Sequence, residues 1–481
     1  GRAEGPRGSF SRPSFLQLTP EELLLADDHT GRTVQSPRES RRRLPWSTGY
    51  AEVINAGKSQ HNEDQACCEA VFVEKRDTLR NNPGHKGISG ESEVSGEQLV
   101  NQSFFHSWVS ICLYFYYWGL FDGHAGSGAA IMASKLLHFH IRDQLQDLVD
   151  ILQDSSAPPI CLQKGPSTIL TESSKTSLAE EDKEVPNNAL PRFHMEKVVS
   201  RESLVVGAIE NAFKQMVSKQ NKNRLEKAGC FSVPIEQNNI IGRVLAGQLV
   251  QPPTQAGDPT LFLVQQYRIT MGSSMSPKAW KTKTLGYLRP ELLGNEFTYF
   301  EFPRRIQQKE VGKKMLYRDQ NMNGWAYKRI EEDDLKFPLV YGEGKKARMM
   351  ATIGVTRGLG DHDLKVYNSN IHIKPFLSCT PEVHIYDLTQ YEHCPDDVLV
   401  LGTDGLWDVT SDQEVATVVT DVLMGYEPND PCRYTMAAQE LVMRSRGVLK
   451  DRGWRLANDK LGSGDDISVF VIPLGGPGNY S

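Results

Sequence analysis

Acidic residues stand at the ends of four apolar stretches of this sequence. A carboxylate at the end of a strand projects from the rim of a sheet, so several such rims brought together concentrate negative charge that cations must neutralise. A shell of oxygen atoms without His or Cys favours Mg²⁺ or Mn²⁺ over zinc. The acidic residues are Glu63, Asp64, Asp122, Asp404, Asp465 and Asp466.

Two Asp-Gly pairs support the same interpretation. A single Asp-Gly is usually only a turn, but Asp122-Gly123 and Asp404-Gly405 both follow apolar runs of strand character. Glycine lets the backbone turn tightly after each Asp and leaves a carbonyl free to face a metal-bound water. With the Glu-Asp and Asp-Asp pairs at other strand ends, the pattern favours a metal site with oxygen ligands.

Strands and helices come in groups along the chain. Apolar residues at helical spacing predict helices over 129–152, 202–218 and 434–446, and Ser411 and Glu414 form a capping-box pattern before a further helix. Such grouping indicates an α+β fold in which helices cover sheets from the outside. Strand character is found over 50–56, 65–73, 398–402 and 467–474, and in the apolar run 104–121.

Composition divides the chain into ordered and loose segments. Residues 1–45 are rich in Arg, Ser, Pro and Gly, which predicts a disordered N-terminal arm before a single domain over 46–481. A Ser/Thr/Glu/Pro-rich stretch at 154–198 is typical of a disordered linker. Regular patterning is lost over 230–285, and the charged, aromatic stretch at about 288–346 indicates an inserted subdomain.

Charge and cysteine content exclude several classes of protein. The formal net charge of −6 argues against a nucleic-acid partner, which would call for a basic surface. Eight cysteines without CxxC pairs are typical of a reducing compartment, so we expect a cytoplasmic protein, with the nucleus as an additional candidate location. The apolar run 104–121 is at the short end of a membrane-spanning length and carries polar residues, so we expect no transmembrane segment.

The acidic clusters resemble the motifs of the PPM, or type 2C, metal-dependent protein phosphatases, and they occur in the family's order. Further similarities at 44–59, 292–297, 324–328 and 342–348 resemble the vertebrate H/J/M subgroup. Five ordered motifs are a specific signal. They lie at 62–64, 121–124, 354–361, 403–408 and 464–468.

The resemblance implies a four-layer α-β-β-α sandwich of two antiparallel sheets, with metals at one rim and the insertion forming a flap beside the active site. It also implies phosphorylated proteins as substrates and two bound ions, Mg²⁺ or Mn²⁺. In this family pattern Asp122 would bridge the two ions. Glu63, Asp64 and the Gly123 carbonyl would hold one of them, directly or through water.

The remaining roles follow from the same resemblance. Asp404 and Asp465 would hold the other ion, and Asp408 would serve a weaker third ion. Two metals roughly 3.5–4 Å apart lower the pKa of a bridging water and stabilise in-line displacement at phosphorus. His124 would protonate the leaving serine or threonine oxygen, unless it is a structural, hydrogen-bonding histidine.

Two departures from the family pattern leave a second function open. Ser59 stands where many members have an arginine that clamps the substrate phosphate, and the neighbouring Lys58 could supply only a point charge. The family's Gly-Asp-Ser-Arg motif is absent, and foreign sequence at 230–285 replaces two central strands. The alternatives are therefore a catalytically impaired binding protein or, more weakly, another oxygen-ligand metal hydrolase such as a nuclease.

Overall fold

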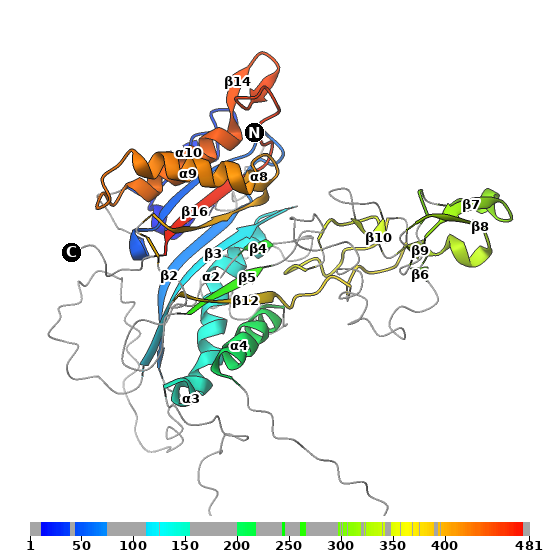
Figure 1. Ribbon diagram of the computed structural model, residues 1–481, viewed down its shortest axis with the longest axis horizontal. Coiled ribbons are helices and arrows are strands. Elements are labelled where there is room, and N and C mark those ends of the chain that lie inside the picture. The colour runs from blue at the N-terminus through cyan, green and yellow to red at the C-terminus, as the bar shows by residue number, and fades with distance from the viewer. Residues whose placement is uncertain are drawn as a thin grey trace, which may run out of the picture.

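The computed structural model describes most of the chain outside a few long segments. Two antiparallel sheets lie at the centre, and helices cover their outer faces (Figure 1). Described are residues 11–38, 44–74, 112–153 without 125, 200–217, 243–245, 260–265, and 297–474 with short gaps.

A three-stranded sheet has its most apolar strand in the middle. Its order is β1-β16-β13, and all seven residues of β16 are buried, as expected for a short, continuous apolar run. The two outer strands pair with it in antiparallel register, with Gly49 and Val400 both opposite Val471. The bounds are β1 Gly49–Val53, β13 Val398–Gly402 and β16 Ile467–Pro473.

A five-stranded sheet of order β12-β5-β4-β3-β2 packs beside the first. The long pairing of β2 with β3 starts with Gln65 opposite Phe121. This register places the residues that precede β2 beside those that follow β3, and both groups contain predicted site residues. The bounds are β2 Gln65–Glu74, β3 Cys112–Asp122, β4 Arg243–Leu245, β5 Thr260–Gln265 and β12 Glu382–Asp387.

Alternation of side chains along the strands builds three separate apolar cores. Tyr50, Trp118 and Phe470 belong to the core between the two sheets, whereas Tyr117 and Val469, each one residue away, belong to the outer cores. Because side chains of a strand point alternately to opposite faces, both sheets must be covered on two sides. The four-layer arrangement follows from this requirement.

The helices form the outer layers. α2, α3 and α4 contribute to the core on the five-stranded sheet, and α9 and α10 to the core on the three-stranded sheet (Figure 1). The capping box of Ser411 and Glu414 is present, and the predicted α+β sandwich is confirmed. The bounds are α2 Gly128–Leu145, α3 Val149–Gln153, α4 Arg201–Met216, α8 Asp404–Trp407, α9 Asp412–Met424 and α10 Arg433–Arg446.

The expectation that 230–285 would be irregular is wrong for two of its parts. β4 pairs with β3 at three residues, β5 pairs with β12 at six, and Leu245 opposite Gln265 joins the two strands. Without them β3 and β12 would present open edges, and the apolar run of β5 can supply a partner. The other residues of this range lie outside the described part of the chain, as does the predicted linker at 154–198.

The prediction of a disordered arm over 1–45 is also wrong for residues 11–38. Leu16 is buried in the core between the sheets, and Gln35 forms a bridge with Glu52 of β1. Thr19 and Glu22 form a capping box at the start of α1 (Pro20–Ala26). One short apolar patch among Arg, Ser and Pro is a weak signal, because the partners of Phe15 in this patch, Tyr50 and Phe470, lie far along the chain.

Short two-stranded sheets lie in and next to the inserted range 288–346. They project away from the sandwich in Figure 1, which agrees with a flap, although the boundaries of that subdomain stay a prediction. No helix in the described residues is long and apolar enough to cross a membrane. The bounds are β6 Phe297–Thr298, β7 Lys314–Tyr317, β8 Ala326–Arg329, β9 Phe337–Pro338, β10 Val340–Tyr341 and β11 Arg348–Met349, with β14 Val448–Lys450 and β15 Gly453–Arg455 elsewhere.

Asp361, in the segment between β11 and β12, provides a test of this packing. It is fully buried, and neither carboxylate oxygen has a hydrogen-bond partner among the described residues. Burial raises its pKa to about 7, against the opposing effect of Lys374. Its contribution to stability is therefore present below about pH 4, the unfolded value, and is lost as the pH rises through 7.

We expect Asp361→Asn to remove this pH dependence, because the amide stays neutral and asparagine tolerates the same positive φ of 51°. Relative to the unsubstituted chain, the variant should gain on the order of 2 kcal/mol between pH 5 and pH 8. Urea unfolding at both pH values measures the difference. Parallel pH profiles for the two proteins would show that Asp361 is not buried as a neutral acid.

Candidate active site

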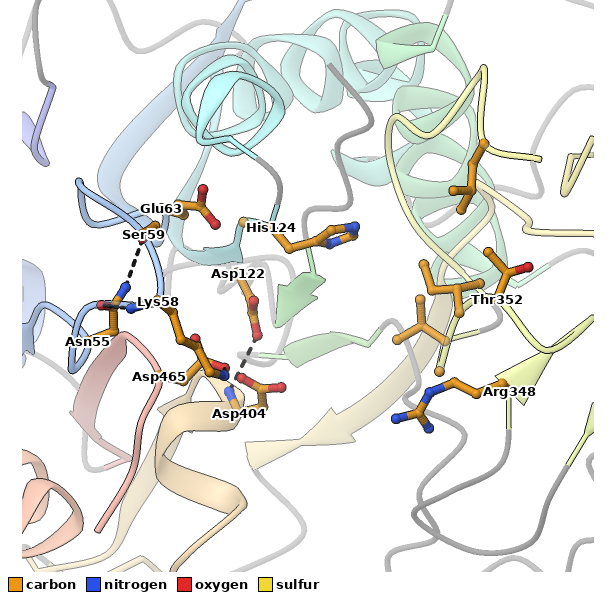
Figure 2. A pocket seen from close by; sticks show the side chains of 15 residues that line it. Asn55, Lys58, Ser59, Glu63, Asp122, His124, Arg348, Thr352, Asp404 and Asp465 are labelled. Carbon is orange, nitrogen blue, oxygen red and sulfur yellow. Dashed lines mark hydrogen bonds and ion pairs between the residues drawn. The ribbon is translucent and has the colours of Figure 1, made fainter. Parts of the chain in front are cut away.

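One pocket collects most of the predicted site residues from both sheets. They come from the loop between β1 and β2, the end of β3, the start of α8 and the turn before β16 (Figure 2). Two predicted residues, Asp64 and Asp408, are outside its lining. The predicted residues in the lining are Lys58, Glu63, Asp122, Gly123, His124, Asp404 and Asp465.

The ends of the two sheets are joined behind this pocket. Asp122 is the last residue of β3, and its Oδ2 lies 3.5 Å from the backbone nitrogen of Asp404 at the start of α8. Thr403 is fully buried, and its hydroxyl accepts a hydrogen bond from the Ser468 N–H at 3.0 Å. The carboxylates of Asp122 and Asp404 are thus placed by buried backbone contacts.

Glu63 is held at both its backbone and its carboxylate. Its N–H donates to Oδ2 of Asp466 at 2.8 Å, and its Oε1 accepts from the Gly126 N–H at 2.8 Å. Burial raises the pKa of Glu63, and the hydrogen bond from Gly126 acts in the opposite direction. These two contacts fix the orientation of the Glu63 carboxylate.

Asp64 lies behind the pocket as a buried carboxylate. Burial raises its pKa well above the usual value, and the nearby charges of Asp122 and Asp466 act in the same direction. Its Oδ2 has no hydrogen-bond partner in the part of the chain that the structure describes. A buried oxygen in that state is costly unless a cation or water completes it.

Asp466 is a site residue whose role the sequence did not reveal. Its two carboxylate oxygens accept hydrogen bonds of 2.8 Å from the backbone N–H groups of Asn55 and Glu63. Burial raises its pKa to about 7, although these two hydrogen bonds lower it. Its position beside Asp465 in the Asp-Asp pair was the available signal, but the pair alone could not tell the buried member from the pocket-facing one.

Lys58 contacts a carboxylate in the pocket. Its Nζ lies 2.6 Å from Oδ2 of Asp465, and the two side chains are 61% and 40% exposed. Burial lowers the pKa of Lys58, but the hydrogen bond to Asp465 and the charges of Asp404 and Asp408 raise it above the usual value. The ammonium group therefore partly neutralises the acidic cluster, and its predicted role in binding phosphate stays a prediction.

Two further predicted positions take part in local structure. Ser59 accepts a hydrogen bond from Asn55 Nδ2 at 2.8 Å and donates to the His61 carbonyl at 2.7 Å. Asp408 is exposed at the end of α8, where its N–H donates to the Asp404 carbonyl. The role of Asp408 at a third ion stays a prediction.

Arg348 and Thr352 line the pocket and were missed in the sequence. Figure 2 shows Arg348 with its guanidinium directed into the pocket from the side opposite Lys58. A Cβ on Gly354 would lie 3.2 Å from Nη1 of Arg348, so the glycine leaves room for the guanidinium. Arg348 ends the stretch 342–348 that resembles the H/J/M subgroup, but this resemblance gave it no role, because its place in the pocket depends on how the chain returns from the inserted range.

The pocket supplies the kind of ligand atoms that a divalent cation prefers. It consists of carboxylate oxygens that repel one another, and the buried Oδ2 of Asp64 lacks a partner among the described residues. Gly123 approaches so closely that a Cβ there would lie 2.4 Å from the Glu63 carbonyl oxygen. In the described residues, however, no three or more His, Cys, Asp or Glu side chains converge on one metal position.

Comparison with known proteins assigns the family. The Protein phosphatase 2C family profile matches residues 323–446. The chain is 58% identical to protein phosphatase 1J of Rattus norvegicus (98% of this chain, 87% of that protein) and 57% identical to the Homo sapiens protein (100% and 88%). Protein phosphatase 1H of Xenopus tropicalis is 52% identical (97% and 92%). The chain belongs to the protein phosphatase 2C family and is a serine/threonine protein phosphatase.

Among these relatives the chain is more similar to the J type than to the H type, which agrees with the subgroup indicated by its motifs. A solved structure of serine-threonine phosphatase 2C from Toxoplasma gondii covers 92% of this chain and 98% of its own. Its identity is 13% and its TM-score 0.34, so the family assignment rests on the sequence relatives.

The close approach of Gly123 to Glu63 generates a testable prediction. Gly123→Ala should destabilise the protein by about 1–3 kcal/mol, because the new methyl group would push the Glu63 backbone out of place. Gly464→Ala is the matched control, since a Cβ there meets nothing within 4 Å, and it should change stability by less than about 0.5 kcal/mol. Denaturant unfolding of both variants measures the difference, and equal effects would contradict the packing described here.

Proposed function

We propose that this chain hydrolyses phosphoserine and phosphothreonine in proteins at a centre of two Mg²⁺ or Mn²⁺ ions. The observation that supports the proposal is the meeting of carboxylates from both sheets in one pocket. Glu63 and Asp122 come from the five-stranded sheet, and Asp404 and Asp465 from the three-stranded sheet. Four carboxylates in one pocket repel one another, so the pocket favours divalent cations.

Different residues of the pocket would hold the two ions. Asp122 lies between the two groups and would be shared, Glu63 and the Gly123 carbonyl would serve one ion, and Asp404 and Asp465 the other. Asp64, whose buried Oδ2 has no hydrogen-bond partner among the described residues, would hold the same ion as Glu63, directly or through water. Bound ions of this kind supply an activated water and neutralise charge that develops at phosphorus.

His124 and Arg348 would act on the substrate. His124 lines the pocket and would hold a proton for the departing serine or threonine oxygen. Arg348 would bind the phosphate, because its planar guanidinium can donate two parallel hydrogen bonds to phosphate oxygens. Lys58 is the other candidate for that contact, but its hydrogen bond to Asp465 holds it at the opposite side of the pocket.

The proposed metal-dependent activity makes a direct prediction. With Mn²⁺ present, the chain should hydrolyse 4-nitrophenyl phosphate, and Asp404→Ala should lower the rate by about 100-fold or more, because charge compensation at the reaction centre is lost. Asp412→Ala is the matched control, since Asp412 is exposed on α9 outside the pocket. Equal rates for the two variants would contradict the proposed site.

A second prediction separates the two candidates for binding phosphate. Arg348→Ala should raise KM for a phosphoserine peptide and the inhibition constant of inorganic phosphate by about tenfold, because a hydrogen bond to a charged group is lost. Lys58→Ala should leave both constants within about threefold of the unsubstituted values, since its ammonium is engaged with Asp465. The opposite ranking of the two variants would assign the phosphate contact to Lys58.

A catalytically impaired binding protein is the second candidate function. Two observations favour it: three metal-ligating side chains do not converge among the described residues, and Lys58 occupies one oxygen of Asp465. The sequence also lacks the Gly-Asp-Ser-Arg motif. Folded protein without Mn²⁺-dependent hydrolysis of either substrate would favour this function over the enzyme.

A further inference from the structure

Two arginines of the N-terminal segment 11–38 are buried behind the pocket. The side chain of Arg12 is 1% exposed and forms an ion pair with Glu52 of β1, while Arg32 is fully buried. Burying a guanidinium costs free energy that an apolar side chain would not, so two such residues in one short segment are a poor way to gain stability alone. Their contacts indicate a different role.

Arg12 holds the backbone on both sides of Glu63. Its Nη1 donates to the carbonyl oxygens of Asp64 at 2.7 Å and Asn62 at 3.4 Å. The carbonyl of the preceding residue, Ser11, accepts a hydrogen bond from Gln65 Nε2 at 2.9 Å. The direction in which the carboxylates of Glu63 and Asp64 leave the backbone therefore depends on a residue about fifty positions away in the sequence.

Arg32 makes the corresponding contacts at the other carboxylate-bearing turn. Its Nη2 donates to the Ser463 carbonyl at 3.1 Å, and its Nε donates to the Ile54 carbonyl at 3.2 Å. The Ser463 hydroxyl in turn accepts from the Asp465 N–H at 3.2 Å. The guanidinium also lies over the Trp454 ring, 4.7 Å from its centroid, which fixes its plane.

We propose that the segment 11–38 is a positioning element of the active site, in which Arg12 orients the Asn62–Asp64 turn and Arg32 orients the Ser463–Asp465 turn. The inference rests on the proposed function for its effect on metal binding, but the positioning itself does not. Neither arginine lines the pocket, so each acts through the backbone that carries the carboxylates. Outer groups that orient metal ligands typically change metal affinity by 10–100-fold when removed.

Conservative substitutions test the positioning. Arg12→Lys keeps a positive charge for Glu52 but loses the Nη1 group that donates to two carbonyl oxygens. Arg32→Lys keeps the charge at its site but loses the separate Nε and Nη2 donors to the Ile54 and Ser463 carbonyls. Arg12→Met combined with Glu52→Gln removes the ion pair without leaving a buried charge alone. Leu16→Ala is the matched control, because this substitution weakens the same segment through the apolar core, and a leucine side chain donates no hydrogen bond to either turn.

Amide hydrogen exchange gives the first readout, on protein without added metal. We expect exchange at residues 62–65 to become about tenfold faster in both Arg12 variants, and exchange at residues 463–466 to become about tenfold faster in Arg32→Lys. The Arg12 variants should leave exchange at 463–466 unchanged, and Arg32→Lys should leave exchange at 62–65 unchanged. Leu16→Ala should raise exchange in its own segment and leave both turns as they were. Equal effects of Leu16→Ala and the arginine variants on the turns would overturn the proposal.

Binding of Mn²⁺ gives the second readout, measured from the electron paramagnetic resonance signal of the free ion. The dissociation constant should rise by about tenfold or more in the arginine variants and by less than about twofold in Leu16→Ala. If the unsubstituted chain bound no Mn²⁺ while exchange rose at the two turns as expected, the proposed metal centre would fail and the positioning role would stand. Unchanged exchange together with unchanged Mn²⁺ binding would overturn the positioning role.

Discussion

Electrostatic repulsion among carboxylates at the meeting point of two sheets is the constraint on which the rest of the site depends. Asp64 is buried close to the charges of Asp122 and Asp466, and all three carboxylates must be kept near one another by the fold. Two cations act on the acidic cluster: Lys58 pairs with Asp465 in the pocket, and the charge of Arg12 acts on Asp466 from behind it. The sandwich supplies the rigid strand ends that such an arrangement needs, since loops alone would separate the charges.

Backbone hydrogen bonds carry much of this positioning. Asp466 accepts from two N–H groups of the loop that leads to Glu63, so a carboxylate of one sheet holds a loop of the other. The arginines of the N-terminal segment bind carbonyl oxygens of the same turns. Asp466 and the two arginines thus satisfy backbone groups of the turns that carry the carboxylates, which holds these turns in place.

Local pattern predicted most of the sandwich, and its limits are physical. β13 and the start of β16 were located from apolar runs, because short runs rich in β-branched residues favour buried strands over helices. Asp122 and Asp404 were identified as candidate site residues because each stands at the end of such an apolar run. Arg12 and Arg348 were not, since their positions depend on contacts between residues far apart in sequence. The sequence did not predict β4 and β5 as strands, because their own patterning is weak and their pairing with β3 and β12 joins residues far apart in the chain.

β4 links the fold of the five-stranded sheet to the proposed active site. It pairs with the last three residues of β3, which include Asp122, so it helps to hold the strand end that presents this carboxylate. Among the described residues, β4 meets β5 on its other side through Leu245 opposite Gln265. β2 pairs with the same end of β3, where Gln65 lies opposite Phe121. The position of Asp122 is therefore set by strand pairing on both edges of β3.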